Sequence, residues 1–223
     1  KKILNVAWVN IYKPFLSSDK YFIWPRGLPL DEINGDQIRL SNKKYENNFY
    51  LQQGVCDLNP DVDAIYRMYK KKINVKFKDI KINIASSLTP FNSQNTTWHK
   101  SLLPLMYLPV TCTMRCTDIW RSLIALRILG VNSMNIMFDG PTVFQKRNYH
   151  NLEKDFKDEV SMYMNNKKIY EILKKLKLKR GIKNFDKNLL SCYKILIKNS
   201  FFQKNEIVFL KAWLTDCKNL KLI

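Results

Sequence analysis

An aspartate between two arginines is the first feature of this sequence that could do chemistry. Asp118 follows Arg115 by three residues and precedes Arg121 by three, near the expected start of a helix. A carboxylate there could cap the helix, act as a general base or hold a sugar hydroxyl. Guanidinium groups bind phosphate through paired hydrogen bonds. Asp118 and Arg121 are therefore candidate catalytic residues, with a helix cap as the alternative for Asp118, and Arg115 is a candidate for binding phosphate or shaping the site.

A polar loop between two aromatic side chains is the second candidate. Amides and hydroxyls run consecutively between Phe91 and Trp98. Like sugar hydroxyls, such groups donate and accept hydrogen bonds, and an aromatic ring suits the C–H face of a sugar. An ordinary polar loop would have the same composition. The residues predicted here to bind substrate are Asn92, Ser93, Gln94 and Asn95.

Three carboxylates lie within seven residues of one another at the expected start of a helix, in the segment from Asp57 to Asp63. Acidic residues stabilise a first helical turn. Asp61 and Asp63, two residues apart, could also hold a hard cation such as Mg²⁺ or Mn²⁺, so a divalent cation is a possible cofactor. Arg67 follows Asp63 by four residues, which predicts an ion pair on the helix surface.

The cysteines and histidines do not form a metal motif. The chain has five cysteines, and Cys112 and Cys116 have only His99 as a nearby histidine. A zinc site therefore lacks ligands, and buried free thiols are expected, although a disulfide between distant cysteines stays open. Arg147 and His150 close a segment that mixes cations, an amide and an aromatic ring. Arg147 is predicted to contact substrate, whereas His150 is given no catalytic role.

The chain of 223 residues carries a net charge of +19, which raises the question of nucleic-acid binding. The basic residues are spread along the chain, and neither a zinc finger nor an RNA-binding aromatic motif is present. The densest basic stretch, residues 167–187, is expected to be a solvated helix face, with phosphate or membrane headgroups as alternative contacts. A hydrophobic content of 46% predicts a folded core, and no apolar run reaches the roughly 18 residues of a membrane span.

The elements that must position these residues are short strands and two helices before residue 151. A helix is expected to start at Asn59 and Pro60, with Ala64, Ile65 and Met68 on its buried face. Strands are expected at residues 80–85, where apolar and polar residues alternate, and at residues 131–138. A turn is expected at residues 139–141. A second helix is expected from residue 117 or 118 to residue 129, with Gly130 ending it.

From about residue 151 the character of the sequence changes. Glycine occurs only at Gly181, proline is absent, and apolar residues recur at helical spacing. Three or four helices are expected, the last ending near residues 213 and 214. We therefore divide the chain into a motif-bearing core, residues 1–150, and a helical extension packed on it, residues 151–223. Because functional residues concentrate on loops held by a scaffold, the site is expected before residue 151.

An ordered set of motifs in this chain resembles the STELLO-type glycosyltransferase family, and more distantly the reversibly glycosylated polypeptides. Several motifs in one order are more specific than any of them alone. The resemblance covers roughly residues 20–165, with weaker helical similarity to the end. The motifs are WPRGLPL at 24–30, NPDVDAIYR at 59–67, PFNSQNT at 90–96, LPVT at 108–111, Arg115, DIWR at 118–121, QKRNYH at 145–150 and DFKDE at 155–159.

The resemblance implies an α/β fold: a GT-A-like mixed sheet with flanking helices, followed by the helical C-terminal region. It implies transfer of a sugar from a nucleotide-sugar donor to a glycan or protein acceptor, in eukaryotes typically in the Golgi. Trp120, within the DIWR motif, joins the predicted substrate-binding residues. The family's Asp-rich metal motif lies upstream of the matched segment, and no such motif precedes Tyr21. The expectation is that part of the N-terminal nucleotide-binding half is missing here.

Two other classes of function remain open from the sequence. A glycosyltransferase-like module without activity, working by binding partners, would explain the missing acidic motif. A basic nucleic-acid-binding protein would explain the charge, and would bind DNA with a strong dependence on salt.

Overall fold

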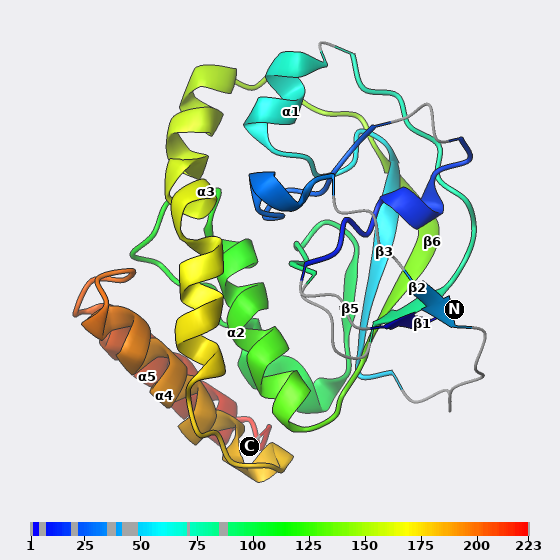
Figure 1. Cartoon of the computed structure of the whole chain (residues 1–223). Coiled ribbons are helices and arrows are strands. Elements are labelled where there is room, and N and C mark those ends of the chain that lie inside the picture. The colour runs from blue at the N-terminus through cyan, green and yellow to red at the C-terminus, as the bar shows by residue number, and fades with distance from the viewer. Residues whose placement is uncertain are drawn as a thin grey trace.

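The computed structural model describes residues 2–4, 8–18, 22–34, 39–41, 49–70, 72–84 and 89–222, and shows one mixed sheet with helices stacked beside it (Figure 1). The predicted mixed α/β fold is confirmed, while its GT-A-like character stays a prediction. The strands are β1 (Lys2–Leu4), β2 (Arg39–Ser41), β3 (Leu51–Leu58), β4 (Ile82–Ile84), β5 (Thr96–Trp98) and β6 (Ile136–Gln145). The α-helices are α1 (Ala64–Tyr69), α2 (Thr117–Val131), α3 (Leu152–Lys174), α4 (Phe185–Lys198) and α5 (Glu206–Asn219).

The strands of the sheet run in the order β2-β1-β4-β6-β3-β5. β3 and β6 are parallel, as are β1 and β4, whereas β1–β2, β3–β5 and β4–β6 are antiparallel. Leu51 pairs with Ile136 and Leu58 pairs with Gln145, so β3 and β6 end at the same edge of the sheet. Ligands of open α/β sheets bind outside the carboxyl ends of parallel strands, which marks this edge as the place to look.

The first helix starts later than its sequence predicts. α1 begins at Ala64 because the carboxylate of Asp63 is its N-terminal cap and accepts the N–H of Tyr66 at 2.8 Å, whereas the side-chain amide of Asn59 does not cap it. The predicted buried face is also wrong in part, since Met68 is exposed whereas Tyr66 and Arg67 are buried. This short helix packs against α3, and that contact, rather than the apolar spacing, selects the inner face.

The predicted helix near residue 118 is confirmed as α2, with Trp120, Leu123 and Ile124 buried in its core-facing stripe. Gly130 does not end it but lies in its last turn.

The strand expected at residues 131–138 starts and ends later, as β6 (Ile136–Gln145), and the turn expected at residues 139–141 lies inside it. The register with β3 shifts between Gly54 and Cys56, opposite Asp139 and Val143. This bulge absorbs the glycine and the proline of the supposed turn, so the strand continues through them.

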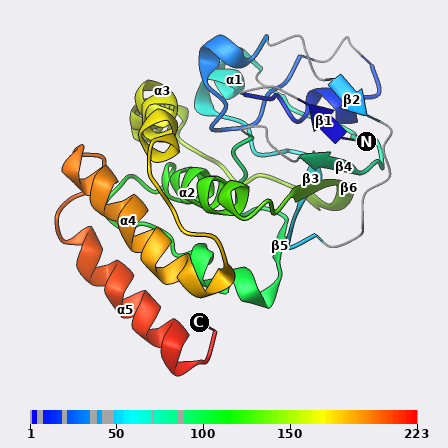
Figure 2. The ribbon, with the colours of Figure 1, turned by 60° about the horizontal axis from the view of Figure 1, so that its bottom comes forward.

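The helices predicted after residue 151 are confirmed as α3, α4 and α5, with the last one ending at Asn219 rather than near residue 214. α3 packs on α1 and α2, and α4 packs on α2, α3 and α5, so α4 and α5 lie on the side of α2 away from the sheet (Figure 2). Within the described parts of the chain, no helix is long and apolar enough to cross a membrane.

The predicted free thiols are confirmed. All five cysteines are free, and only Cys112 is not fully buried. In the dense basic stretch, most lysine side chains are exposed, but Lys167 pairs with Asp31 and Glu32.

Candidate functional site

A cavity of about 250 Å³ lies where the parallel strands β3 and β6 end. All the residues that line it precede residue 151, the part of the chain where the site is expected. Six predicted site residues line it, together with four that the sequence analysis did not single out for this role. The lining residues are Arg26, Asp61, Arg67, Asn92, Gln94, Arg115, Asp118, Gln145, Arg147 and His150.

Arg26 lies in the wall of the cavity and bridges two carboxylates. Its Nη2 donates to Asp61 Oδ2 at 2.8 Å and to Asp118 Oδ2 at 2.9 Å, and its Nη1 donates to Asp118 Oδ1 at 3.0 Å. Burial lowers the pKa of Arg26, but the two carboxylates more than offset this and raise it well above its usual value. Burial likewise raises the pKa of Asp61, yet Arg26 brings it below its usual range. The guanidinium of Arg26 therefore fixes the positions of the two carboxylates relative to each other.

Asp118 has little capacity left for a further partner. Its Oδ1 also accepts the N–H of Ile119 at 3.0 Å, and its Oδ2 accepts the N–H of Ser93 at 3.2 Å. A carboxylate offers about four lone-pair sites, and Arg26 with these two N–H groups uses four. Asp118 thus positions Arg26 and the polar loop. Its predicted catalytic role stays a prediction, and it requires one of these hydrogen bonds to break.

The polar loop divides between the cavity and the sheet. Asn92 and Gln94 line the cavity, and Asn92 Oδ1 accepts the N–H of Gln94 at 2.9 Å. Asn95 turns toward β6, where its Nδ2 donates to Thr142 Oγ1 at 3.0 Å. Ser93 Oγ accepts from Arg121 at 3.1 Å. Asn92 and Gln94 are therefore the loop side chains placed to meet a ligand in this cavity.

Two predicted site residues lie behind the cavity wall. Arg121 is buried, with its guanidinium 5.0 Å from the ring centre of Trp98, and burial lowers its pKa. Trp120 is also buried, and its Nε1 donates to Asn166 at 3.0 Å. Neither side chain lines the cavity, so both support the wall in this arrangement and their predicted contacts with substrate stay untested.

The two aspartates predicted as metal ligands face different partners. Asp63 is fully buried and accepts the Nε1 of Trp24 at 2.6 Å, whereas Asp61 is held by Arg26. Burial raises the pKa of Asp63 to about 6. The described residues contain no group of three or more side chains placed to hold a metal ion. With their oxygens engaged by these donors, Asp61 and Asp63 do not fit a shared cation in this arrangement, and no catalytic step is assigned to one.

Besides Arg26, three arginines line the cavity, and one of them lacks a carboxylate partner among the described residues. Arg115 Nε donates to Glu159 at 2.8 Å, and Arg147 Nη2 donates to Asp155 at 2.9 Å. The predicted ion pair between Arg67 and Asp63 is wrong. Both side chains are buried, and each forms its hydrogen bonds with other neighbours. Arg67 instead donates to two neutral oxygens, Asn59 Oδ1 at 3.1 Å and the carbonyl of Pro60 at 2.9 Å.

The electrostatics of Arg67 favour an anion. The side chain is only 6% exposed, and its Nε has no hydrogen-bond partner. Burial, followed by repulsion from Arg147, lowers its pKa to about 10, while burial and Arg115 lower the pKa of Arg147. A buried cation is stable when it is paired, and guanidinium forks match phosphate and carboxylate oxygens. The cluster can therefore bind an anion with more than one negative oxygen.

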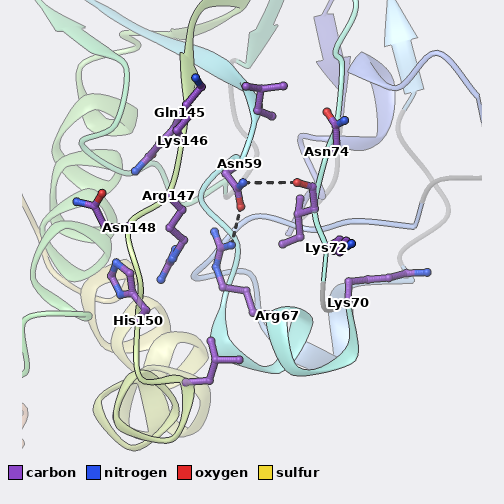
Figure 3. A pocket seen from close by; sticks show the side chains of 13 residues that line it. Asn59, Arg67, Lys70, Lys72, Asn74, Gln145, Lys146, Arg147, Asn148 and His150 are labelled. Carbon is purple, nitrogen blue, oxygen red and sulfur yellow. Dashed lines mark hydrogen bonds between the residues drawn. The ribbon is translucent and has the colours of Figure 1, made fainter.

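A wider opening of about 660 Å³ adjoins the cavity and shares four of its lining residues: Arg67, Gln145, Arg147 and His150. Figure 3 shows Arg67 between the segment that follows β6 on one side and Lys70, Lys72 and Asn74 on the other. His150 Nδ1 lies 3.2 Å from Asp155 Oδ2, which orients the imidazole. His150 thus lines both openings, and the expectation that it has no catalytic role stays untested.

The residues that sequence reasoning missed as site residues are Arg26, Arg67, Gln145 and His150. One signal could have found the arginines. Lysine dominates the basic residues of this chain, so each arginine is informative, and both Arg26 and Arg67 lie within the family-like motifs. Nothing local marks Gln145, because its position depends on where β6 ends.

These features define a mixed α/β domain with an arginine-rich cavity at the ends of its parallel strands. Comparison with known protein families finds that residues 115–223 match the STELLO glycosyltransferases. The chain is also 25% identical over 218 residues to "Probable glycosyltransferase STELLO2" of Arabidopsis thaliana, covering 93% of this chain and 28% of that protein. It is 24% identical over 219 residues to "Probable glycosyltransferase STELLO1" of the same plant, covering 93% of this chain and 27% of that one.

The predicted resemblance is confirmed: over most of its length this chain is similar to the STELLO glycosyltransferases. It spans about 28% of the length of the relatives it matches. The matched segment includes Arg115, Asp118 and Arg147 of the cavity, together with all three C-terminal helices.

Proposed function

We propose that this chain binds the nucleotide-sugar donor of a glycosyltransferase that acts on a glycan or protein acceptor. The observation that carries the proposal is the buried guanidinium of Arg67, which has no carboxylate partner among the described residues and lies beside Arg147. A donor diphosphate is an anion of the kind that this cluster suits. Neither an inactive partner-binding module nor a nucleic-acid-binding protein has a comparable observation in its favour.

In this proposal the arginines act on the leaving group. Glycosyl transfer passes through an oxocarbenium-like transition state, as glycoside hydrolysis does. Negative charge then develops on the departing diphosphate. Fixed cations that face this charge stabilise the transition state without reorganising. Arg115 and Arg147 are held by Glu159 and Asp155, and are thus oriented before the donor arrives.

The acceptor hydroxyl needs a group that can take its proton. Asp118 has its lone pairs engaged, whereas His150 directs Nδ1 toward Asp155 and leaves Nε2 without a hydrogen-bond partner among the described residues. In the proposal His150 is therefore the general base, and Asp118 keeps Arg26 and the polar loop in place. Asn92 and Gln94 bind hydroxyls of the donor sugar, which retains the substrate-binding role predicted for them.

The test is calorimetric titration of a panel of UDP-sugars into the 223-residue chain, with and without Mn²⁺. Arg67→Gln is expected to weaken donor binding by about tenfold to a hundredfold, the worth of a hydrogen bond to a charged group. Arg180→Gln removes an exposed arginine outside the cavity and is the matched control.

Because Arg67 is buried, Arg147→Gln is measured beside it, and circular dichroism checks that both variants fold. Donor binding that both variants retain in full would contradict the proposal, as would a folded chain that binds no donor. Binding that appears only with Mn²⁺ would place a cation in the site, and would show that the arrangement of Asp61 and Asp118 around Arg26 changes on binding.

A further inference from the structure

The wider opening, which we call the basic cleft, has a lining of one charge sign. Among the described residues that line it, Arg67, Arg147 and three lysines are cationic, and none is an aspartate or a glutamate. Its lining residues are Leu58, Asn59, Arg67, Lys70, Lys72, Ile73, Asn74, Gln145, Lys146, Arg147, Asn148, His150 and Leu152. A concave surface of one charge sign concentrates ions of the opposite sign.

Among the cations of the basic cleft, Arg147 pairs with Asp155, but ion pairs do not explain the others. The lysines at its rim, Lys70, Lys72 and Lys146, are exposed, and no salt bridge is seen for them in the described structure. Lys70 only contacts the ring of Tyr69, with its Nζ at 5.0 Å from the ring centre. At the floor, the buried Nε of Arg67 has no partner. An incoming anion would relieve the repulsion among these groups.

The uncharged part of the lining indicates what carries the negative groups. Amides from three directions line the cleft: Asn59 after β3, Asn74 after α1, and Gln145 with Asn148 at the end of β6. Each amide can donate and accept, which matches sugar hydroxyls. No tryptophan, tyrosine or phenylalanine is among the described lining residues, and the one imidazole, that of His150, lies against Asp155. The cleft therefore lacks the succession of aromatic side chains on which the bases of single-stranded nucleic acid stack.

We infer that the basic cleft binds an acidic saccharide, a chain of sugars that carries carboxylate or sulfate groups, as the acceptor. This rests on the proposed function, because the cleft meets the donor cavity at Arg67, Arg147 and His150. An acceptor lying in the cleft would present a hydroxyl at the boundary where His150 is held by Asp155. The rim lysines select the anionic acceptor, and the amides bind its hydroxyls.

The experiment measures binding of fluorescently labelled hexasaccharides to the whole chain by anisotropy. The probes are an oligogalacturonate, which carries carboxylates, a heparin-derived hexasaccharide, which carries sulfates, and maltohexaose, which is neutral. At least one of the acidic probes is expected to saturate a single site. The neutral probe is expected to bind at least about tenfold more weakly. Raising NaCl from about 50 to about 300 mM should weaken the acidic probes, because exposed charges are screened.

Two triple variants separate the basic cleft from the general positive charge of the chain. Lys70→Ala, Lys72→Ala and Lys146→Ala together are expected to weaken the acidic probes about tenfold. Lys174→Ala, Lys198→Ala and Lys211→Ala together remove the same charge from exposed positions on α3, α4 and α5. This control is expected to stay within about twofold of the unchanged chain. All six side chains are exposed, so both variants should fold.

Three outcomes would overturn the inference. Equal weakening by the two triple variants would mean that only the net charge attracts the probe. Stronger binding of poly-glutamate than of either acidic saccharide would assign the cleft to an acidic peptide. If neither acidic saccharide binds, the cleft is not a binding site for acidic saccharides.

Competition with UDP distinguishes this inference from the proposed function. We expect UDP and the acidic hexasaccharide to bind together. If UDP displaces the saccharide and the cleft variant weakens UDP, the cleft belongs to the donor, so the inference fails while the proposed function stands. If UDP does not bind but the saccharide does, the proposed donor site fails and the cleft remains a saccharide site.

Discussion

At the residue scale, two neighbouring aspartates have opposite protonation behaviour because of what each one touches. Asp61 contacts the guanidinium of Arg26, which brings its pKa below the usual range. Asp63 has no cation within salt-bridge distance among the described residues, and burial raises its pKa to about 6 in spite of the hydrogen bonds from Tyr66 and Trp24. Although they are only two residues apart, Asp61 is thus a charged group in the cavity wall, whereas Asp63 caps a helix inside the core.

The raised pKa of Asp63 predicts a pH-dependent stability. Between its unfolded pKa of about 3.9 and its folded value of about 6, the folded state binds more protons than the unfolded state. The contribution of Asp63 to the free energy of unfolding therefore falls as the pH rises through that window, by about 3 kcal/mol in all. Urea unfolding of the chain and of Asp63→Asn from about pH 4 to about pH 7 measures it. A stability difference that does not change with pH would contradict the assignment.

At the scale of elements, two glycines show how context decides what a missing Cβ is for. A Cβ at Gly140, within β6, would lie 2.7 Å from the Cα of Asp79, a contact with backbone that flexible side chains cannot relieve. A Cβ at Gly130, in the last turn of α2, would meet nothing within 4 Å. The first glycine lets residue 79 approach the bulged strand, whereas the second only weakens a helix.

The two glycines therefore predict opposite effects of the same substitution. Gly140→Ala is expected to lower the free energy of unfolding by about 1–3 kcal/mol, because the strand and residue 79 must separate. Gly130→Ala is expected to raise it by about 0.5–1 kcal/mol through helix propensity. Urea denaturation of both variants checks this, and an unchanged stability of Gly140→Ala would mean that residue 79 can move aside freely.

At the scale of the whole molecule, side chains of the C-terminal helices fix the positions of residues that line the cavity. Arg115 pairs with Glu159 of α3, and Arg147 pairs with Asp155 of the same helix. Farther along, the buried carboxylate of Glu206 on α5 accepts the N–H of Thr111 at 2.8 Å and that of Val110 at 3.1 Å. Side chains on both sides of residue 150 thus combine in one site, although the predicted division of the chain there stays untested.

Glu206 tests this long-range support. Glu206→Ala would leave the Thr111 and Val110 N–H groups and the hydroxyl of Tyr107 without their acceptor. We expect a loss of about 3 kcal/mol or more in the free energy of unfolding, since buried donors left unpaired are costly. Glu171→Ala, at an exposed position of α3, should change it by less than about 0.5 kcal/mol. Equal effects of the two variants in urea denaturation would refute the role of Glu206.

The sequence by itself determined the features that depend on neighbours along the chain. Helical periodicity located α2 and the three helices after residue 151, and ordered motifs identified the relationship to the STELLO glycosyltransferases. Residue type and spacing also selected Asp118, Arg115, Asn92 and Gln94, all of which line one cavity. Local patterns suffice for these because a helix and a polar loop form from residues that are close in sequence.

Only the tertiary structure decided which of the other residues meet there. Arg26 reaches Asp61 across 35 residues and Asp118 across 92. The length of β6 followed from its register with β3, not from the glycine and proline inside it. Arg67 was predicted to lie on the helix surface, but it is buried and lies close to Arg147, which follows β6. Such contacts depend on the packing of segments far apart in the chain, and spacing along the sequence carries no record of it.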